Sequence, residues 1–504
     1  MTSKIKFKKI FAGFLITAFV FGIFGCRTKS QDEKQVYTGV QLTYYKPFDD
    51  SEVIDPLITE YQATHPGLQI TYKKFSDFDE YQKVVLSEMA EGEGPDIFSM
   101  PNWWYASNLG KISPLPQEMG TVDDFSSVFV DVAGRDLVRV DKEGKEQVYA
   151  LPMAVDTLAL YYNKDHFEDR IPDRGKPSKT WEGIKEDVVL LNKIGSKQNS
   201  FDVSGIAMGR WDNISRAVDI LYLLFLQYGV EFYNEIISEA TFAARHEGFL
   251  TYPGLEALNL FISFADPAQK HYSWTETNLD PGSADMEVDA FARGNVSMIT
   301  GYSYMYNDIV NRINVLKAKG EKTMSKDAVK IALIPQVYDP DVSQEKRVTY
   351  ASYFAETVSR NCKRPDIAWD FLIFLTSKDV LNEYFDKTNK PTSRRDMITD
   401  QSKDPIYGVF ARQIGYAESF PIIDYYKYKE IFTEVIKRAY EEGGGTKSNL
   451  VDAQDLIDEM LPKDGYVNEK KAPLPSEVDK ESEGDATDSN EKTTDDAVED
   501  DTGD

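Results

Sequence analysis

The pattern of hydrophobic and polar positions in the first part of the chain predicts strands that alternate with helices. Apolar residues alternate with polar or smaller ones over residues 40–44, which indicates a strand, and recur at helical spacing over residues 54–61. The same order repeats, with a strand at 68–72, a helix at 77–89 and a third strand at 94–100. This alternation predicts a parallel sheet with helices on both faces.

Helical patterns dominate the middle of the chain. Residues 217–226 are apolar nearly all round, which is typical of a helix buried between neighbours, and ten residues are too few to span a membrane. Strand patterns then return, over residues 296–299, 330–335 and 349–358. Because strands reappear after the helical middle, we expect the chain to revisit its sheets and to build each lobe from separate segments.

The N-terminus has the pattern of a secretory signal. Four lysines precede an apolar run of 16 residues, Ile10–Gly25, which is shorter than the ~20 residues that a membrane-spanning helix needs. The run ends in Gly25-Cys26, which resembles the lipobox of bacterial lipoproteins, where the cysteine becomes the lipidated N-terminus. We expect residues 1–25 to be a lipoprotein signal peptide, Cys26 to carry lipid and residues 26–36 to form a tether. The alternative is an ordinary signal peptide with an incidental cysteine.

Composition and charge lower the expectation for several function classes. The 57 Lys and Arg residues face 84 Asp and Glu, and the net charge of −27 argues against a nucleic-acid partner. Part of this charge lies in residues 466–504, a polar, acid-rich tail that we expect to be disordered. Two cysteines and four histidines without close spacing predict no metal site, and the chain shows no motif for a cofactor. Besides Cys26, only Cys362 could supply a thiol, and it fits a small buried hydrophobe.

Five short motifs occur in order along the body of the chain. The longest is LPMAVDTLALYYNKD at residues 151–165, and the other four lie at residues 94–97, 180–182, 290–298 and 368–372. In this order and spacing, the motifs resemble the extracellular solute-binding proteins that feed sugar-type ABC importers, the maltose- and multi-sugar-binding group. The resemblance covers roughly residues 37–461. The acidic tail is not part of the family's pattern.

The resemblance implies an α/β, periplasmic-binding-protein-like fold with two discontinuous α/β lobes, a hinge and an interlobe ligand cleft. We expect residues 37–152 and about 303–357 to form lobe 1, and about 157–299 and about 364–461 to form lobe 2. Three crossovers would join the lobes, near residues 152–157, 299–303 and 357–364.

A sugar site needs aromatic rings for the C–H faces of the ligand and polar or charged groups for its hydroxyls. Such residues cluster at the expected strand ends and crossovers, and the resemblance places an acidic ligand group at Asp156. Adjacent side chains in a loop diverge, so we expect one of two neighbouring tryptophans to contact the ligand and the other to pack. The candidate ligand-binding residues are Lys46, Phe48, Asp49, Asn102, Trp103, Trp104, Asp156, Trp211, Tyr302, Tyr304, Tyr353 and Tyr426. The alternatives are a hinge cap or salt bridge for Asp156 and simple packing for the aromatic residues.

These observations predict a monomeric binding protein outside the cytoplasm, held at the cell membrane by lipid on Cys26. We expect it to capture a sugar or oligosaccharide between Asp156 and the 102–105 loop on one side and Trp211 on the other, and to deliver it to ABC transporter permease subunits. One alternative is a surface carbohydrate-active enzyme, although the adjacent carboxylates at 49–50 diverge and no catalytic motif is present. Another is the same fold used as a sensor or adhesin without a transporter.

Overall fold

The computed structural model describes residues 37–141, 143–196, 200–245, 251–275, 286–339, 341–343, 346–463 and 465–466. The predicted signal peptide, Cys26, the tether and the acidic tail beyond Tyr466 lie outside the described residues. Within these ranges no helix has the length and apolar character needed to cross a membrane.

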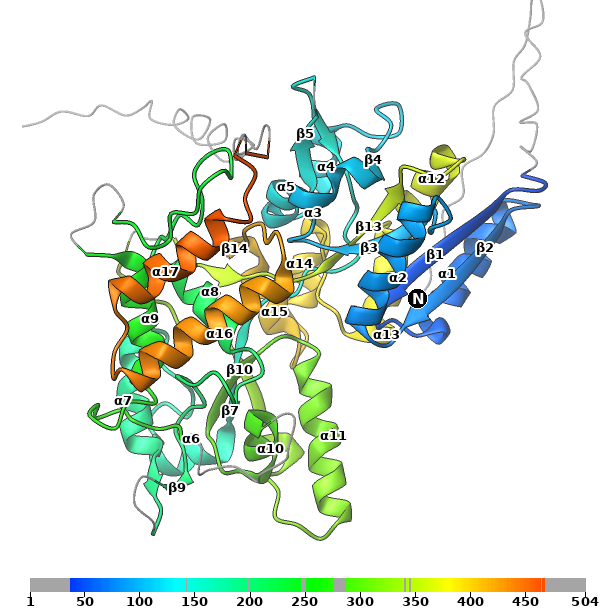
Figure 1. The fold of residues 1–504 in the computed structure, drawn as a ribbon. Helices are drawn as coiled ribbons and strands as arrows, with labels where there is room; N and C mark the ends of the chain where they lie inside the picture. Colours follow the sequence, from blue (N-terminus) through cyan, green and yellow to red (C-terminus); the bar gives the residue numbers. More distant parts are fainter. Residues whose placement is uncertain are drawn as a thin grey trace, which may run out of the picture.

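A five-stranded sheet forms the centre of the first lobe, with the strand order β2-β1-β3-β13-β4. Three of its strands are parallel neighbours from the start of the chain, β1 (Gln41–Pro47), β2 (Gln69–Phe75) and β3 (Ile97–Pro101). Strand β13 (Phe354–Ser359) comes from far along the chain and pairs antiparallel with both β3 and β4 (Ile112–Ser113) (Figure 1). The predicted parallel arrangement is therefore correct for β1 to β3.

Helices α1 (Ser51–Thr64) and α2 (Phe78–Glu91) connect the parallel strands. Asp77 begins α2, because its side chain accepts a hydrogen bond from the backbone N–H of Glu80 at 2.8 Å. The apolar residues at helical spacing in α2 face the sheet, and Tyr81 is fully buried. The remaining elements of this region are α3 (Tyr105–Asn108), α4 (Val122–Val128), α5 (Asp131–Leu137), β5 (Val138–Val140) and β6 (Glu146–Val148).

The second lobe contains a three-stranded antiparallel sheet with the order β10-β7-β11. Its strands are β7 (Ala159–Asn163), β10 (Met298–Gly301) and β11 (Val329–Ala332). Helices α10 (Met286–Arg293) and α11 (Met305–Ala318) pack against each other beside this sheet (Figure 1). The same lobe includes α6 (Lys164–Arg170), α7 (Trp181–Leu191), β8 (Lys193–Ile194) and β9 (Phe201–Val203).

A helical layer completes the second lobe. The predicted buried helix is present as α8 (Ala217–Gln227), which packs against α9 (Pro253–Ser263) and α16 (Tyr425–Glu441). Tyr222 of α8 meets several phenylalanine rings at right angles, which explains why this helix is apolar on nearly all sides. Helix α17 (Lys447–Asp458) packs on α9 and α16.

The packing of four elements differs from the expected division into lobes. Strand β11 pairs with β7 and α11 packs on α10, so both belong to the second lobe, although residues 303–357 were expected in the first. Helices α12 (Pro365–Leu375) and α13 (Lys378–Thr388) pack on α1, where the Tyr61 hydroxyl donates a 2.7 Å hydrogen bond to Asp370. They were expected in lobe 2 but belong to the first lobe. Strand pairing and helix contacts far apart in the sequence decide this division.

The positions at which the chain passes between the lobes also differ from those expected. The expected crossover at 152–157 does lead from β6 to β7, but residues 299–303 connect β10 to α11 within the second lobe. The chain returns to the first sheet between β11 and β13 and reaches the C-terminal helices after α13. The segment between β11 and β13 contains β12 (Thr349–Tyr350). The segment between α13 and α16 contains α14 (Arg395–Gln401), α15 (Gly408–Gln413) and β14 (Ala417–Glu418).

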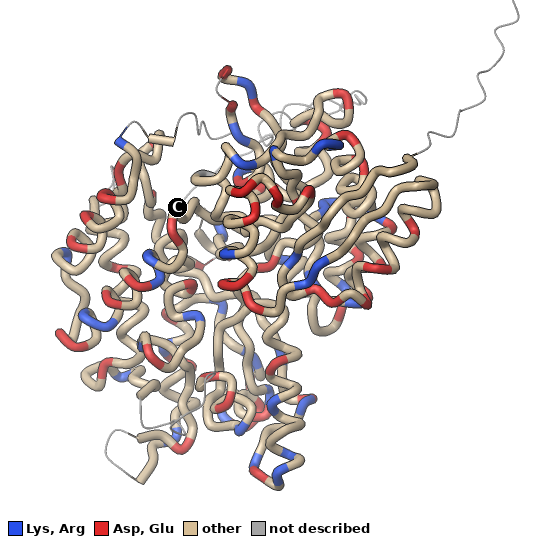
Figure 2. The backbone as a smooth tube through the Cα atoms, turned by 45° about the vertical axis from the view of Figure 1, so that its right-hand side comes forward, with Lys and Arg blue, Asp and Glu red and all other residues tan. Residues whose placement is uncertain are grey.

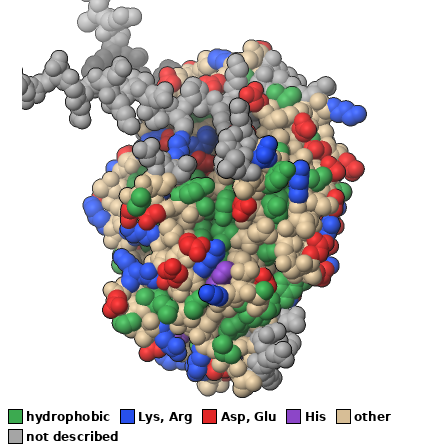
Figure 3. All heavy atoms as spheres, turned by 90° about the vertical axis from the view of Figure 1, so that its left-hand side faces the viewer, with side chains coloured by type: hydrophobic (Ala, Val, Ile, Leu, Met, Phe, Trp, Pro, Cys, Tyr) green, Lys and Arg blue, Asp and Glu red, His purple; other side chains and the backbone are tan. Residues whose placement is uncertain are grey.

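Charged residues are distributed over both lobes. Figure 2 shows acidic and basic residues interspersed along the backbone of the described body. On the face that Figure 3 displays, hydrophobic side chains lie in separate groups between charged ones. That face therefore gives no single indication of a partner, and the cavity described next carries the functional information.

Candidate functional site

A cavity of about 630 Å³ lies where the two lobes meet. The ends of β1 and β3 contribute one wall, the crossover at 153–156 contributes the floor, and α8 and α16 contribute the opposite wall. Its lining is mainly aromatic, with a few charged groups, which is the composition expected of a small-molecule site.

Eight of the twelve predicted binding residues line this cavity. They are Lys46, Phe48, Trp103, Asp156, Tyr302, Tyr304, Tyr353 and Tyr426. Trp211 lies in a smaller neighbouring pocket, and Asp49, Asn102 and Trp104 are buried behind the cavity wall. The fold thus brings together most of the candidates from segments far apart in the sequence.

The two adjacent tryptophans diverge as expected. Trp103 lines the cavity and stacks on Tyr425 of α16, with ring centroids 4.8 Å apart and planes inclined by 15°. Both tryptophans are buried, Trp103 at 6% and Trp104 at 4% exposure, but Trp104 does not line the cavity, and its carbonyl accepts a 3.0 Å hydrogen bond from the side chain of Asn108. The prediction that Trp104 binds ligand is therefore not supported by its position, because packing removes its ring from the cavity.

Asn102 holds the cavity wall from behind. Its Nδ2 donates to Asp136 at 3.0 Å, its Oδ1 accepts from the backbone N–H of Tyr353 at 3.1 Å, and the Tyr353 hydroxyl donates to Asp136 at 2.8 Å. Burial raises the pKa of Asp136, although Ser419 and the other donors oppose this effect. This buried network fixes the tyrosine ring that lines the cavity, so Asn102 positions the site and does not line it.

A buried ion-pair cluster lies under the end of β1. Lys46 bonds to Glu356 of β13 and lies 3.5 Å from Asp49, while Asp49 also bonds to Lys390 and accepts a 2.6 Å hydrogen bond from Tyr384. Burial alone would raise the pKa of Asp49, but the two lysines outweigh it and lower that pKa to about 2. The cluster joins three segments of the chain, so Asp49 has a structural role beneath the cavity.

Phe48 occupies a strained turn at the mouth of the cavity. The backbone N–H of Asp49 donates to the carbonyl of Pro47 at 2.9 Å, which makes Phe48 the central residue of a γ-turn with φ of 71°. A bulky residue rarely adopts this backbone conformation. The phenyl ring is 48% exposed and meets Phe354 edge-on at 6.0 Å. The ion pairs on both sides of the turn hold the ring in this position.

Asp156 of the crossover lines the cavity and is held in place by hydrogen bonds. Its carboxylate lines the cavity and accepts hydrogen bonds from the backbone N–H and hydroxyl of Ser303, at 3.1 and 2.6 Å, and from the N–H of Thr157 at 2.8 Å. Burial raises the pKa of Asp156 to about 6, which outweighs these bonds. The crossover is thereby fastened to the loop that carries Tyr302 and Tyr304.

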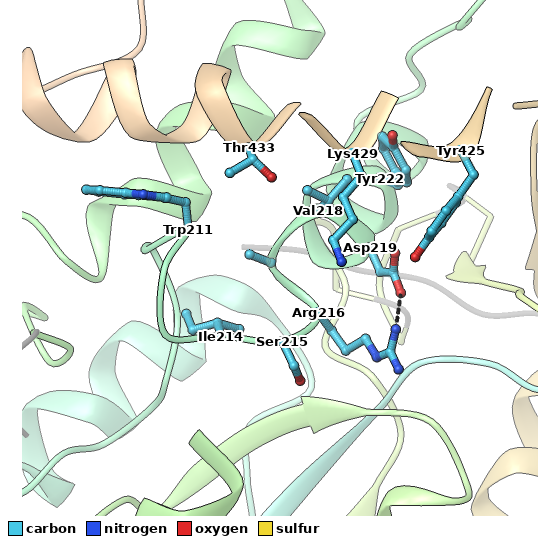
Figure 4. Close-up of a pocket in the computed structure, with 11 residues that line it drawn as sticks. Trp211, Ile214, Ser215, Arg216, Val218, Asp219, Tyr222, Tyr425, Lys429 and Thr433 are labelled. Carbon is cyan, nitrogen blue, oxygen red and sulfur yellow. Dashed lines mark ion pairs between the residues drawn. The ribbon is translucent and has the colours of Figure 1, made fainter. Parts of the chain in front are cut away.

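The start of α8 adds charged groups that the sequence patterns did not reveal. The Tyr302 hydroxyl donates to Asp219 at 3.0 Å, and Arg216 bonds to the Tyr304 hydroxyl. Figure 4 shows Arg216, Asp219, Tyr425 and Lys429 around one space. These four residues line both the cavity and the smaller pocket, so the two spaces adjoin each other.

Trp211 lies at the far end of the smaller pocket (Figure 4). Its ring is 5.3 Å from that of Tyr440, and the Arg210 guanidinium lies 4.9 Å from its centre. The expectation that Trp211 faces the ligand across the main cavity is therefore not met in this structure. Neighbouring aromatic and cationic groups keep its ring in the side pocket.

Sequence reasoning missed several lining residues: Phe78, Tyr350, Phe354, Arg216, Asp219, Tyr384, Lys390 and Lys429. Asp219 did leave a signal, since it is the acidic residue within the apolar run of α8. The others lie on helices, at strand ends or, like Arg216 and Lys390, beside a helix end, and the direction they face depends on the packing of the lobes.

The described residues contain no group of three or more His, Cys, Asp and Glu side chains that could hold a metal ion. Cys362 is buried, as expected for a small hydrophobe, and burial raises the pKa of its thiol to about 12. The thiol is therefore protonated and unreactive at neutral pH.

Comparison with known proteins identifies the class. The family model of bacterial extracellular solute-binding proteins matches residues 46–381, and the chain belongs to this family. A binding protein of Brucella abortus (strain 2308) is 23% identical over 411 residues, which cover 80% of this chain and 88% of that protein. Membership of this extracellular family fits a location outside the cytoplasm.

Two solved structures share the fold. The sugar-binding protein MalE from Xanthomonas citri aligns with a TM-score of 0.66 at 14% identity, over 84% of this chain and 97% of that one. The cyclic alpha-maltosyl-1,6-maltose binding protein from Arthrobacter globiformis aligns with a TM-score of 0.62 at 18% identity, over 84% of this chain and 100% of that one. The fold is periplasmic-binding-protein-like, with two discontinuous α/β lobes, as predicted.

Proposed function

We propose that this protein captures a sugar or oligosaccharide in the cavity between its lobes and delivers it to the permease subunits of an ABC transporter. The observation that carries the proposal is the lining of the cavity, where aromatic rings from both lobes surround a few polar groups. Trp103 from the first lobe and Tyr425 from the second stack on each other, and the cavity-lining residues Phe48, Tyr304 and Tyr426 are each at least 40% exposed. Aromatic faces of this kind match the C–H faces of sugar rings, and the surrounding hydroxyl and charged groups match their hydroxyls.

The related structures support the same ligand class. The Xanthomonas citri protein is described as sugar-binding, and the Arthrobacter globiformis protein is described as binding cyclic alpha-maltosyl-1,6-maltose. Both resemble this chain in fold at low identity. The aromatic cavity of this chain lies where its two lobes meet, and such a position suits a ligand that both lobes contact.

We propose that the ligand favours closure of the hinge because it contacts both lobes at once. A ligand that touched Phe48 and Trp103 alone would bind the open and closed forms equally and would not shift their populations. Contacts with Tyr304 and Tyr426 on the other side would make the affinity of the closed form higher than that of the open form. Both residues are about 40% exposed and line the cavity. Closure would then present both lobes together to the transporter.

We also propose that residues 1–25 are removed and that lipid on Cys26 holds the protein at the cell membrane. Two acyl chains, at ~0.8 kcal/mol per buried CH₂, would give stable anchoring without a membrane span. Residues 26–36 would then separate the folded body from the lipid surface as a tether.

A thermal-shift screen with a panel of neutral and charged saccharides tests the proposal directly. A ligand at about 100 times its Kd should stabilise the protein by about 2.7 kcal/mol. Chromatography of the bound saccharide afterwards should recover it intact, whereas a carbohydrate-active enzyme would cleave or modify it. Absence of stabilisation across the whole panel would refute sugar capture.

A further inference from the structure

The charged groups around the cavity differ in how many hydrogen bonds and ion pairs they form within the protein. Three carboxylates line it, and each accepts hydrogen bonds from protein donors. Asp156 accepts from Ser303 and Thr157, Asp219 accepts from the Tyr302 hydroxyl, and Asp79 at the exposed edge accepts from the Tyr426 hydroxyl. Acceptor groups in the cavity are thus largely engaged before any ligand arrives.

The cations on the first lobe are also engaged. Lys46 is buried and bonds to Glu356 and Ser99, with Asp49 3.5 Å away. Lys390 bonds to Asp49 and lies over the ring of Tyr384. These two lysines therefore have counter-charges in the fold, and their positions follow from the ion-pair cluster under β1.

The cations on the second lobe are less completely satisfied. The Arg216 guanidinium bonds to the Tyr304 hydroxyl and forms an ion pair with Asp219 at 3.9 Å, which is too long for a hydrogen bond, and its Nε has no hydrogen-bond partner among the described residues. Lys429 of α16 is exposed and makes no ion pair or hydrogen bond within the described part of the chain. Both side chains border the space shown in Figure 4, where the cavity joins the smaller pocket.

We propose that the captured saccharide carries an anionic group, the carboxylate of a uronic acid or a sulfate ester, that binds to Lys429 and Arg216. The inference rests on the proposed function and specifies its ligand class. A guanidinium at the residue before α8 and an ammonium on α16 are suited to an oxyanion, because arginine offers a planar pair of donors and lysine a compact charge. Closure around a neutral sugar would remove water from the Lys429 ammonium without supplying an acceptor of opposite charge, and Asp219, the carboxylate beside Arg216, already accepts from Tyr302.

Isothermal titration calorimetry with matched trisaccharides tests this inference on the full chain. Uronate trimers of several linkages are each compared with the neutral trimer obtained by reducing their carboxylates, and with the sulfated form of that neutral trimer. At least one anionic trimer should bind about tenfold more tightly than its neutral counterpart, as expected for one charge-assisted hydrogen bond. Preference for the uronate or for the sulfated form then identifies the anionic group.

Two variants on α16 provide the matched comparison. Lys429→Gln should reduce the preference for the anionic trimer about tenfold, because it removes one charge that faces the cavity. Lys427→Gln removes a charge from the same helix at a residue that bonds to Glu430 and does not line the cavity, so the preference should persist. Equal effects of the two substitutions would overturn the assignment.

The outcomes separate this inference from the proposed function. If neutral trimers bind as tightly as the anionic ones, the anionic ligand class is wrong and sugar capture stands. If no trimer binds and the panel of neutral and charged saccharides also gives no thermal shift, sugar capture fails together with the anionic ligand class.

Discussion

The strained turn at Phe48 predicts that glycine will be more stable than alanine at this position. Both substitutions remove the phenyl ring and its contact with Phe354, so the difference between them isolates the backbone. At φ of 71° alanine retains a conformation that disfavours any residue with a Cβ atom, whereas glycine adopts it freely.

The expected magnitude follows from two opposing effects. The left-handed conformation costs a residue with a Cβ atom roughly 1–2 kcal/mol, and Phe48→Gly relieves it. Glycine also loses more freedom on folding than alanine, which opposes the gain by roughly 0.5–1 kcal/mol. Phe48→Gly should therefore exceed Phe48→Ala in stability by about 0.5–1 kcal/mol, the reverse of the usual order.

Urea unfolding of the two variants, followed by circular dichroism, measures this difference. The control is an Ala and Gly pair at Glu430, an exposed residue inside α16. There alanine should be more stable by about 1 kcal/mol, because no left-handed conformation is involved. The comparison uses only the difference between the Ala and Gly variants at each position, so it does not depend on the absolute free energy of unfolding.

The same order of stability at Phe48 and at Glu430, with alanine above glycine, would refute the reasoning about strain. Ligand affinity gives a second, independent reading. If the turn exists to present the phenyl ring to the sugar, both Phe48 variants should bind more weakly than the native protein, whichever is more stable. Unchanged affinity would mean that the ring does not contact the ligand.

Three further predictions concern acid stability, stacking and anchoring. The stability that Asp49 contributes should be present above pH 4 and be lost as pH falls from about 4 to about 2, because its folded pKa lies near 2. Urea unfolding at a series of pH values should show a loss of about 2 kcal/mol in the free energy of unfolding over this range, and Asp49→Asn should reduce that loss. Trp103→Ala should weaken saccharide binding by ~1–3 kcal/mol in calorimetry, a range taken from base–aromatic stacking, whereas Trp104→Ala should chiefly lower the unfolding midpoint. Cys26→Ala should move the protein from the membrane fraction to the soluble fraction or leave it unprocessed, and an unchanged membrane-bound form would contradict the lipid anchor.

Local signals explain which parts of the fold the sequence predicted. The helix expected at 77–89 corresponds to α2, because the Asp77 cap and the apolar spacing act within a few residues. The strand expected at 349–358 is divided into β12 and β13, which join different sheets. The strand at 330–335 was recognised but pairs with β7 of the second lobe. Partners of a strand lie far away in sequence, and periodicity carries no information about them.

The site shows the same limit. Phe48, Trp103 and Asp156 were found because each follows a strand end or lies in the crossover motif. Arg216, just before α8, and Lys429, on α16, were missed because a charged residue at such a position usually faces solvent and only packing between lobes turns it toward a cavity. Trp104 was included because the sequence does not tell which of two adjacent buried tryptophans borders the cavity.

The position of β13 between β3 and β4 has a consequence for how the chain folds. Residues 354–359 lie more than two hundred residues beyond their partner strands, so the first sheet stays divided until nearly three quarters of the chain has been synthesised. Pairing at such sequence separation closes a long loop and slows folding. A polypeptide that ends before Phe354 should therefore lack a complete first lobe, and the native protein should acquire its interlobe cavity only in the last stage of folding.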